Sequence, residues 1–216
     1  MPPTVDQLEL GPIGTNTYLV RAEPSATEAV VIDPSGDVPA ILNALERARA
    51  RCAAILVTHG HFDHVIGLAE LAEETGAPVH APEGERALLE HPEAFTPAGL
   101  VVRPCGVANW LRGGETIDAA GLSFQVRLVP GHSPGHVAYA VDGVLFAGDV
   151  LFAGSVGRTD LPGGDWELLS RSIGSLVAAH PGETIVYPGH GPATTLGAEL
   201  ARNPFLDAIR AARGAS

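Results

Sequence analysis

The stretch "THGHFDH", residues 58–64, places three histidines and an aspartate within six consecutive positions. It follows the apolar run "AAILV" (53–57), which is typical of a buried strand, so the chain leaves a sheet at this point. In extended backbone His59 and His61 would point the same way, and a helix that follows would present Asp63 and His64 on a second front. Since imidazole and carboxylate suit zinc or iron, the stretch predicts two pairs of metal ligands facing neighbouring points.

Three later apolar runs of strand character also end in a glycine and then a metal-binding type of residue. "LVPGHS", "LFAGDV" and "VYPGHG" deliver His132, Asp149 and His190 in this way. The small residue lets the backbone approach a site closely, and sites of layered α/β proteins collect at strand ends. Five histidines and two carboxylates at strand ends would be a costly polar core without a cation. We therefore predict that they hold metal rather than serve as hydrogen-bonded core residues.

The pattern along the 216 residues predicts an α/β protein. Hydrophobic residues make up 45%, enough for one sizeable core, and we expect a single domain over residues 1–216. Strands are expected at 5–10, 16–22, 29–33, 53–59, 122–132, 136–143, 144–152 and 184–190. Helices are expected at 37–51, 64–76, 84–91, 165–180 and 198–212, the last with a break near Pro204, and the rest of 81–114 is expected to be loop. Two β-then-α halves favour two sheets covered by helices on both sides.

The composition narrows the classes of binding partner and the cellular compartment that we expect. The net charge is −12 and all thirteen basic residues are arginine, so an acidic surface argues against nucleic acid. No apolar run reaches the roughly 18 residues of a membrane span, and the first residues lack the basic and apolar parts of a signal peptide. Cys52 and Cys105 show no C-x-x-C spacing, which fits a reducing compartment. We expect a cytoplasmic protein; the sequence does not indicate its oligomeric state.

The motif H-x-H-x-D-H, followed by isolated His, Asp and His after strands, resembles the metallo-β-lactamase superfamily over nearly the whole chain. The resemblance implies a four-layer αβ/βα sandwich, in which two mixed sheets are flanked by helices and metals lie in a cleft at the sheet edges. Matched by position, it assigns one divalent metal to His59, His61 and His132, a second to Asp63, His64 and His190, and the bridge to Asp149. Two such cations can share a hydroxide, oriented here by Asp63 and Asp149, that attacks a substrate carbonyl. Zinc is the expected metal, with iron and manganese as alternatives.

Three segments, "PGHSPGHVAY" (130–139), "GDVLFAGSVGRTDLPGGDWELL" (148–169) and "YPGHGPATTLGAELARNPFL" (187–206), are similar to a short bacterial form of glyoxalase II, the hydroxyacylglutathione hydrolases. That resemblance implies hydrolysis of a small-molecule thioester, S-lactoylglutathione, to D-lactate and a thiol. We expect no separate C-terminal glutathione-binding helical domain of the kind that the family carries, and Asp160 and Pro192 stand where the family has tyrosines. The resemblance thus supports hydrolysis of a thioester better than it supports glutathione as the thiol part of the substrate.

Arg158 occupies the position of a family lysine or arginine, and it is the expected substrate anchor. Its guanidinium suits a carboxylate through a bidentate pair, but an ion pair with Asp160 is equally open.

Other functions remain open. A persulfide dioxygenase resembles this chain in "GRTD" and would bind one iron through His59, His132 and Asp149. A lactonase or general esterase of the same fold is a third possibility, and a non-enzymatic scaffold would have to keep the whole ligand set unused.

Overall fold

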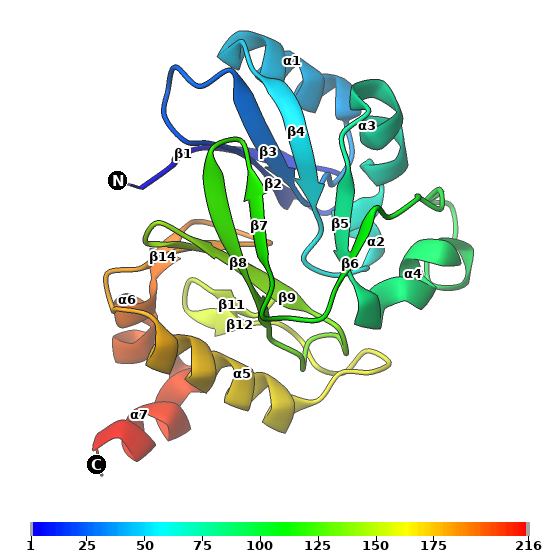
Figure 1. Ribbon diagram of the computed structural model, residues 1–216. Helices are drawn as coiled ribbons and strands as arrows, with labels where there is room; N and C mark the ends of the chain where they lie inside the picture. Colours follow the sequence, from blue (N-terminus) through cyan, green and yellow to red (C-terminus); the bar gives the residue numbers. More distant parts are fainter. Residues whose placement is uncertain (1, 215–216) are drawn as a thin grey trace.

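The computed structural model describes residues 2–214, which form two six-stranded sheets stacked face to face with helices on both outer sides (Figure 1). The first sheet has the order β1 (Thr4–Leu10), β2 (Thr15–Arg21), β3 (Glu28–Ile32), β4 (Arg51–Leu56), β5 (Val79–Pro82) and β6 (Asn109–Leu111). Its first three strands pair antiparallel, and β3 to β6 pair parallel. Because parallel strands end at the same edge, the end of β4 opens toward the loops that carry the chemistry.

The second sheet has the order β14 (Thr194–Thr195), β13 (Ile185–Pro188), β10 (Val144–Gly148), β9 (Val137–Val141), β8 (Leu122–Leu128) and β7 (Thr116–Ala119). Only β10 and β13 pair parallel among these described strands. The central strands β9 and β10 are buried along their whole length, whereas β8 alternates between buried and exposed residues. A two-stranded ribbon of β11 (Leu151–Phe152) and β12 (Ser155–Val156) extends from this sheet.

Helices cover the outer faces of both sheets. On the first side lie α1 (Val38–Ala48), α2 (Phe62–Val65) and α3 (Leu68–Thr75), and on the second side lie α5 (Trp166–Ala179), α6 (Leu196–Arg202) and α7 (Asp207–Gly214). Between the two halves run α4 (Arg86–Glu90) and the 3₁₀ turns η1 (Glu83–Glu85) and η2 (Pro92–Ala94), and η3 (Pro204–Leu206) separates α6 from α7. The predicted four-layer αβ/βα sandwich is confirmed.

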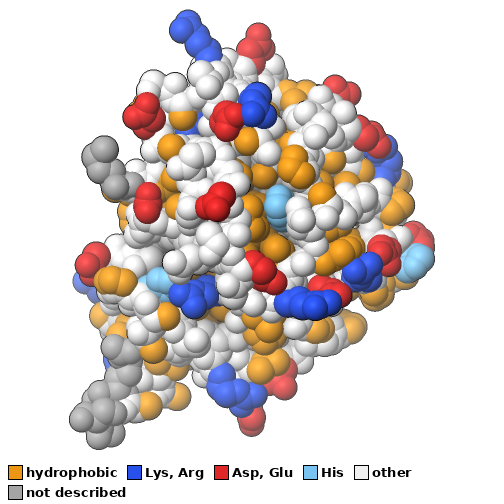
Figure 2. All heavy atoms as spheres, in the orientation of Figure 1, with side chains coloured by type: hydrophobic (Ala, Val, Ile, Leu, Met, Phe, Trp, Pro, Cys, Tyr) orange, Lys and Arg blue, Asp and Glu red, His pale blue; other side chains and the backbone are white. Residues whose placement is uncertain are grey.

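Three hydrophobic clusters fill the spaces between these layers. One joins α1 and α3 to the first sheet, the second lies between the sheets, and the third joins the second sheet to α5 and α6. Side-chain caps fix the helix starts: the Asp37 side chain accepts a hydrogen bond from the Ala40 amide, and the Asp165 side chain accepts one from the Leu168 amide at the start of α5. On the face drawn in Figure 2, acidic and basic side chains are interspersed.

Two expected helices end differently from the prediction. The helix expected at 64–76 is split into α2 and α3, because Gly67 lies against Pro34, whose carbonyl oxygen accepts a hydrogen bond from the Gly67 amide at 3.0 Å. The helix expected at 37–51 stops at Ala48, since Arg49 adopts a left-handed conformation with φ of 54°. The chain then enters β4 at Arg51.

Strand boundaries also differ. The strand expected at 144–152 is interrupted at Asp149, because Gly148 turns the chain with φ of 48° and lifts the carboxylate out of the sheet. The segment 81–114, expected to be mostly loop, contributes to β5 and supplies β6, two short strands that exist through pairing with β4 and with each other. Within residues 2–214, no helix combines the length and apolar character needed to cross a bilayer.

Candidate metal centre

The seven side chains that the sequence singled out meet at one edge of the sandwich, although they come from four separate segments. The ligand atoms of three groups lie within 4.8 Å of one another: His59, His61 and His132; His59, His64 and Asp149; Asp63, His64 and His190. Four of the seven, residues 59, 61, 63 and 64, follow β4. His132, Asp149 and His190 lie in the loops after β8, β10 and β13 respectively. We call these seven residues the ligand cluster. Its compactness depends on Gly189, where a Cβ atom would lie 2.1 Å from Asp149 Oδ1.

Three ring nitrogens face one another in the first part of the cluster. His61 Nδ1 lies 3.1 Å from His59 Nε2 and 2.9 Å from His132 Nε2. The Thr58 hydroxyl donates its proton to Asp33, so it accepts from His59 Nδ1, and His132 Nδ1 donates to the Arg158 carbonyl oxygen. Both Nε2 atoms therefore present lone pairs, and a single proton on His61 cannot serve both. A shared cation fits these three nitrogens.

Oxygen and nitrogen alternate in the second part of the cluster. His64 Nε2 lies 3.3 Å from Asp63 Oδ2 and 3.4 Å from Asp149 Oδ1, and His190 Nε2 lies 3.3 Å from Asp63 Oδ2. Two ligands each about 2.1 Å from a tetrahedral cation are about 3.4 Å apart. Among residues 2–214, the buried atoms His64 Nε2 and Asp149 Oδ1 have no hydrogen-bond partner, a costly arrangement that a cation would relieve.

Asp149 lies between the two parts. Its Oδ1 faces His64, and its Oδ2 lies 3.5 Å from His190 Nε2 and 3.6 Å from His132 Nε2. This is the position from which one carboxylate can serve two cations.

Comparison with known proteins places this arrangement in a family. The profile of the metallo-beta-lactamase superfamily matches residues 10–190. The chain belongs to the metallo-beta-lactamase superfamily. It is 35% identical over 185 residues to the hydroxyacylglutathione hydrolase GloC of Haemophilus influenzae, covering 83% of this chain and 87% of GloC.

Two solved structures are similar over almost the whole chain. The BLEG-1 B3 metallo-beta-lactamase is 41% identical with a TM-score of 0.86, covering 94% of this chain and 100% of that one. TTHA1623 in a di-iron-bound form is 40% identical with a TM-score of 0.82, covering 93% and 100%. Membership of the metallo-beta-lactamase superfamily, together with the His/Asp cluster, supports a hydrolase that depends on divalent metal.

The two parts of the cluster differ in their affinity for protons. Burial lowers the pKa of His59 well below its usual value and that of His61 to about 4, so both rings are neutral at pH 7. Burial also opposes charge on His64, but the surrounding carboxylates, Asp149 foremost, outweigh it and raise its pKa well above the usual value. Hydrogen bonds to carboxylates, again Asp149 first, raise the pKa of His190 to about 9. A cation entering the second part must therefore displace protons.

Residues behind the cluster fix the direction of its rings. Asp33, directly after β3, accepts from the Thr58 amide at 2.7 Å and the Thr58 hydroxyl at 2.7 Å, and it contacts His64 Nδ1 at 2.9 Å. The Thr15 hydroxyl donates to Asp63 Oδ2 at 2.7 Å. Sequence reasoning missed these partners; Asp33 alone carried a signal, since it follows an apolar strand as Asp149 does.

Glu85 is a further residue that the sequence did not single out. It is fully buried, and its two oxygens accept hydrogen bonds from the Gly135 amide at 2.6 Å and the Gly60 amide at 3.2 Å. Gly60 lies between His59 and His61. Glu85 therefore ties the first ligand loop to the loop that carries His132.

Three other side chains near the cluster have distinct places. His136 accepts from the Asp149 amide at 3.0 Å and stacks on His59 with ring centroids 4.6 Å apart. Ser133 is only 1% exposed, and its hydroxyl has no hydrogen-bond partner in the part of the chain that the structure describes. Arg158 forms a bidentate ion pair with Asp160, with both distances 2.7 Å, as the structural alternative had predicted.

Five of the seven residues of the cluster lie on the floor of an open cleft of about 650 Å³, and His59 and His64 are buried behind them. The cleft is walled by the turn between β1 and β2, by the segment around η2, by β11 and β12, and by the loop 158–162. His61, Asp63, His132, Asp149 and His190 all line it, so a small molecule in the cleft reaches both parts of the cluster.

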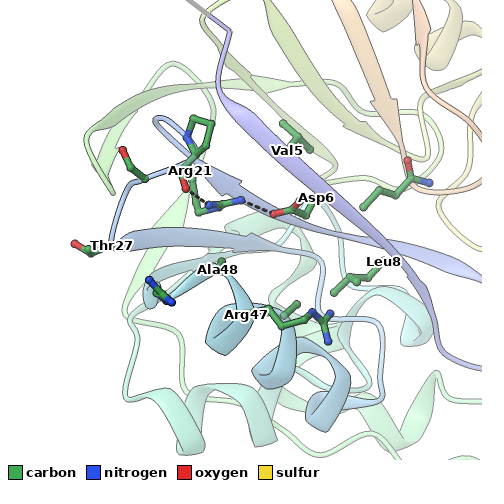
Figure 3. A pocket seen from close by; sticks show the side chains of 12 residues that line it. Val5, Asp6, Leu8, Arg21, Thr27, Arg47 and Ala48 are labelled. Atoms are coloured by element: carbon green, nitrogen blue, oxygen red, sulfur yellow. Dashed lines mark hydrogen bonds and ion pairs between the residues drawn. The ribbon is translucent and has the colours of Figure 1, made fainter.

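A second, larger groove of about 970 Å³ lies between β1 and α1, away from the cluster (Figure 3). Figure 3 shows Arg21 directed at Asp6, to which it donates a hydrogen bond at 2.9 Å. The described residues that line it include no histidine or cysteine, and its single carboxylate is engaged by that arginine. This groove therefore lacks the groups for metal-assisted hydrolysis, and the smaller cleft is the candidate active site.

Proposed function

We propose that the protein hydrolyses thioesters with two divalent metal ions, zinc first among them, held by the ligand cluster. The observation that carries the proposal is the convergence of five imidazoles and two carboxylates at one place, where three of the imidazoles and both carboxylates line an open cleft. Among residues 2–214, the buried atoms His64 Nε2 and Asp149 Oδ1 of this cluster have no hydrogen-bond partner. The 35% identity to the hydroxyacylglutathione hydrolase GloC supports a thioester as the substrate.

The protein's own residues arrange the donors before any metal arrives. His59, His61 and His132 would hold one ion, and Asp63, His64 and His190 the other, with Asp149 between them. Bound divalent ions lower the pKa of water toward neutrality and polarise a carbonyl group. In the overall reaction the oxygen of water forms a bond to the acyl carbon and the carbon–sulfur bond breaks. One proton of the water goes to the sulfur, so that the products are a carboxylic acid and a thiol.

The carboxylates orient the reacting water. Asp63 is fixed by the Thr15 hydroxyl, so that its Oδ2 atom keeps its direction toward His64 and His190. Asp149 presents one oxygen to each part of the cluster. Preorganised groups of this kind need no rearrangement during the reaction, and this is a major source of catalytic rate.

A substrate panel with metal-replete protein tests the proposal. We expect release of free thiol from S-lactoylglutathione or from simple acyl thioesters, and no release after chelation of the metal. Oxygen uptake with glutathione persulfide and one iron per chain would indicate instead the persulfide dioxygenase that "GRTD" favours. A metal-replete protein that leaves every thioester intact would refute the proposal.

A further inference from the structure

The walls of the cleft over the ligand cluster are mostly apolar, although the hydrolysis itself needs only the metal ligands on its floor. Above the ligand cluster they are formed largely by Ile13, Phe62, Phe95, Phe152, Val156 and Leu161. Ile13 and Phe95 are 57% and 52% exposed, which places two of the largest exposed apolar side chains of the described chain on this cleft. Exposed apolar groups that line a concave site mark a surface that binds apolar ligand atoms.

Polar groups on the walls are few. Apart from the ligand cluster, the described lining residues include only Ser133 and Arg158 as polar side chains. Ser133 is buried, so Arg158 is the polar wall residue open to a ligand.

Arg158 is already engaged. Its Nε and Nη2 atoms donate to the two carboxylate oxygens of Asp160, both at 2.7 Å, which uses one bidentate edge of the guanidinium and neutralises its charge. The pair has no net charge. The protein as a whole carries −12, which repels anions on approach.

We infer that the cleft selects uncharged thioesters with apolar acyl groups, and that Asp160 makes it reject anionic thiols by occupying Arg158. This inference rests on the proposed thioesterase function. Asp160 is thereby a specificity-determining residue.

Two thioesters with the same acyl group separate the effects of charge from those of shape. Hexanoyl-N-acetylcysteamine is neutral, whereas S-hexanoylglutathione carries two carboxylates and one ammonium group. With the metal-replete full chain we expect a higher kcat/KM for the neutral ester. Lengthening the acyl group from acetyl to hexanoyl on N-acetylcysteamine should raise kcat/KM by about fourfold per buried methylene.

The variant Asp160→Asn keeps the shape of the side chain and frees Arg158. We expect the ratio of kcat/KM, glutathione ester over neutral ester, to rise by about three- to fivefold at low ionic strength, because an arginine then faces the anion across water. The rise should vanish in about 1 M salt, where the screening length is only about 3 Å.

Glu28→Gln is the matched control. It removes one exposed acidic charge and frees Arg51, its ion-pair partner at the start of β4, the end opposite the cluster. Its substrate ratio should equal that of the unaltered protein, so a shift confined to Asp160→Asn reports the cleft rather than net charge.

The outcomes separate this inference from the proposed function. No thiol released from either ester would refute the thioesterase itself. Hydrolysis with a preference for the glutathione ester, no gain with acyl length, or equal ratios in the two variants would overturn the inference and leave the thioesterase standing.

Discussion

Replacing Glu85 tests whether the first part of the ligand cluster is held in place by a buried carboxylate. This residue accepts hydrogen bonds from the amide of Gly60, in the loop after β4, and of Gly135, in the loop after β8 that carries His132, and it has no exposed surface. Glu85→Gln keeps its volume but turns one acceptor into a donor, so that one of the two amides loses its partner. Glu85→Ala leaves both amides without one.

The magnitudes follow from these two hydrogen bonds. A buried N–H without a partner costs about 1–3 kcal/mol, so Glu85→Gln should lower the free energy of unfolding by about that amount. Glu85→Ala should lower it by about twice as much, because two donors are orphaned. The glutamine variant loosens the two loops that carry His59, His61 and His132. The affinity of these three histidines for metal should therefore fall about 10- to 100-fold.

Urea unfolding of the metal-free protein and a zinc titration against a chelating dye measure the two effects. Glu199→Gln is the control: Glu199 is a buried carboxylate that accepts from the Gly154 amide and from Asn203, away from the cluster. It should lose stability by a similar amount but keep its metal affinity. Affinity of Glu85→Gln within twofold of the unaltered protein would show that the carboxylate does not position the ligands.

Three further predictions concern the cluster itself. Asp149→Ala should reduce thioester turnover by at least about 100-fold while the metal-free protein keeps its far-ultraviolet circular dichroism, because the carboxylate facing both parts is gone; retained turnover would contradict its bridging position. Filling the second part with zinc at pH 7 should release about two protons, since the pKa of His190 is raised to about 9 and that of His64 also lies high, and apparent affinity should rise with pH up to about 9; calorimetric enthalpies independent of the buffer would argue against this. Gly189→Ala should destabilise the protein by about 1–3 kcal/mol and lower its metal content, because the added Cβ would lie 2.1 Å from Asp149 Oδ1; unchanged melting temperature and metal content would refute the close packing.

The site residues at strand ends could be predicted because a strand-like apolar run is followed each time by a residue type that binds metal. An apolar run, a glycine and then His132, Asp149 or His190 can be recognised in the sequence, and each of these residues does lie in the loop that follows a strand. The four-layer architecture was likewise predictable from the order of strands and helices together with the family resemblance.

The supporting residues could not be found in this way, because long-range contacts define them. Glu85 belongs to a short helical segment that looks ordinary in the sequence, and only the fold brings it to Gly60 and Gly135. Thr15 is 48 residues from Asp63, to which it donates its hydroxyl proton. The pairing of Arg158 with Asp160 was foreseen only as one of two alternatives, since a guanidinium suits a protein carboxylate and a substrate carboxylate equally well.

The metal content of the purified full-length protein tests the central claim most directly. After zinc supplementation and removal of loosely bound ions, elemental analysis should find two divalent metal ions per folded chain. A folded chain that retains one ion, or none, would contradict an arrangement in which all seven side chains of the cluster are ligands.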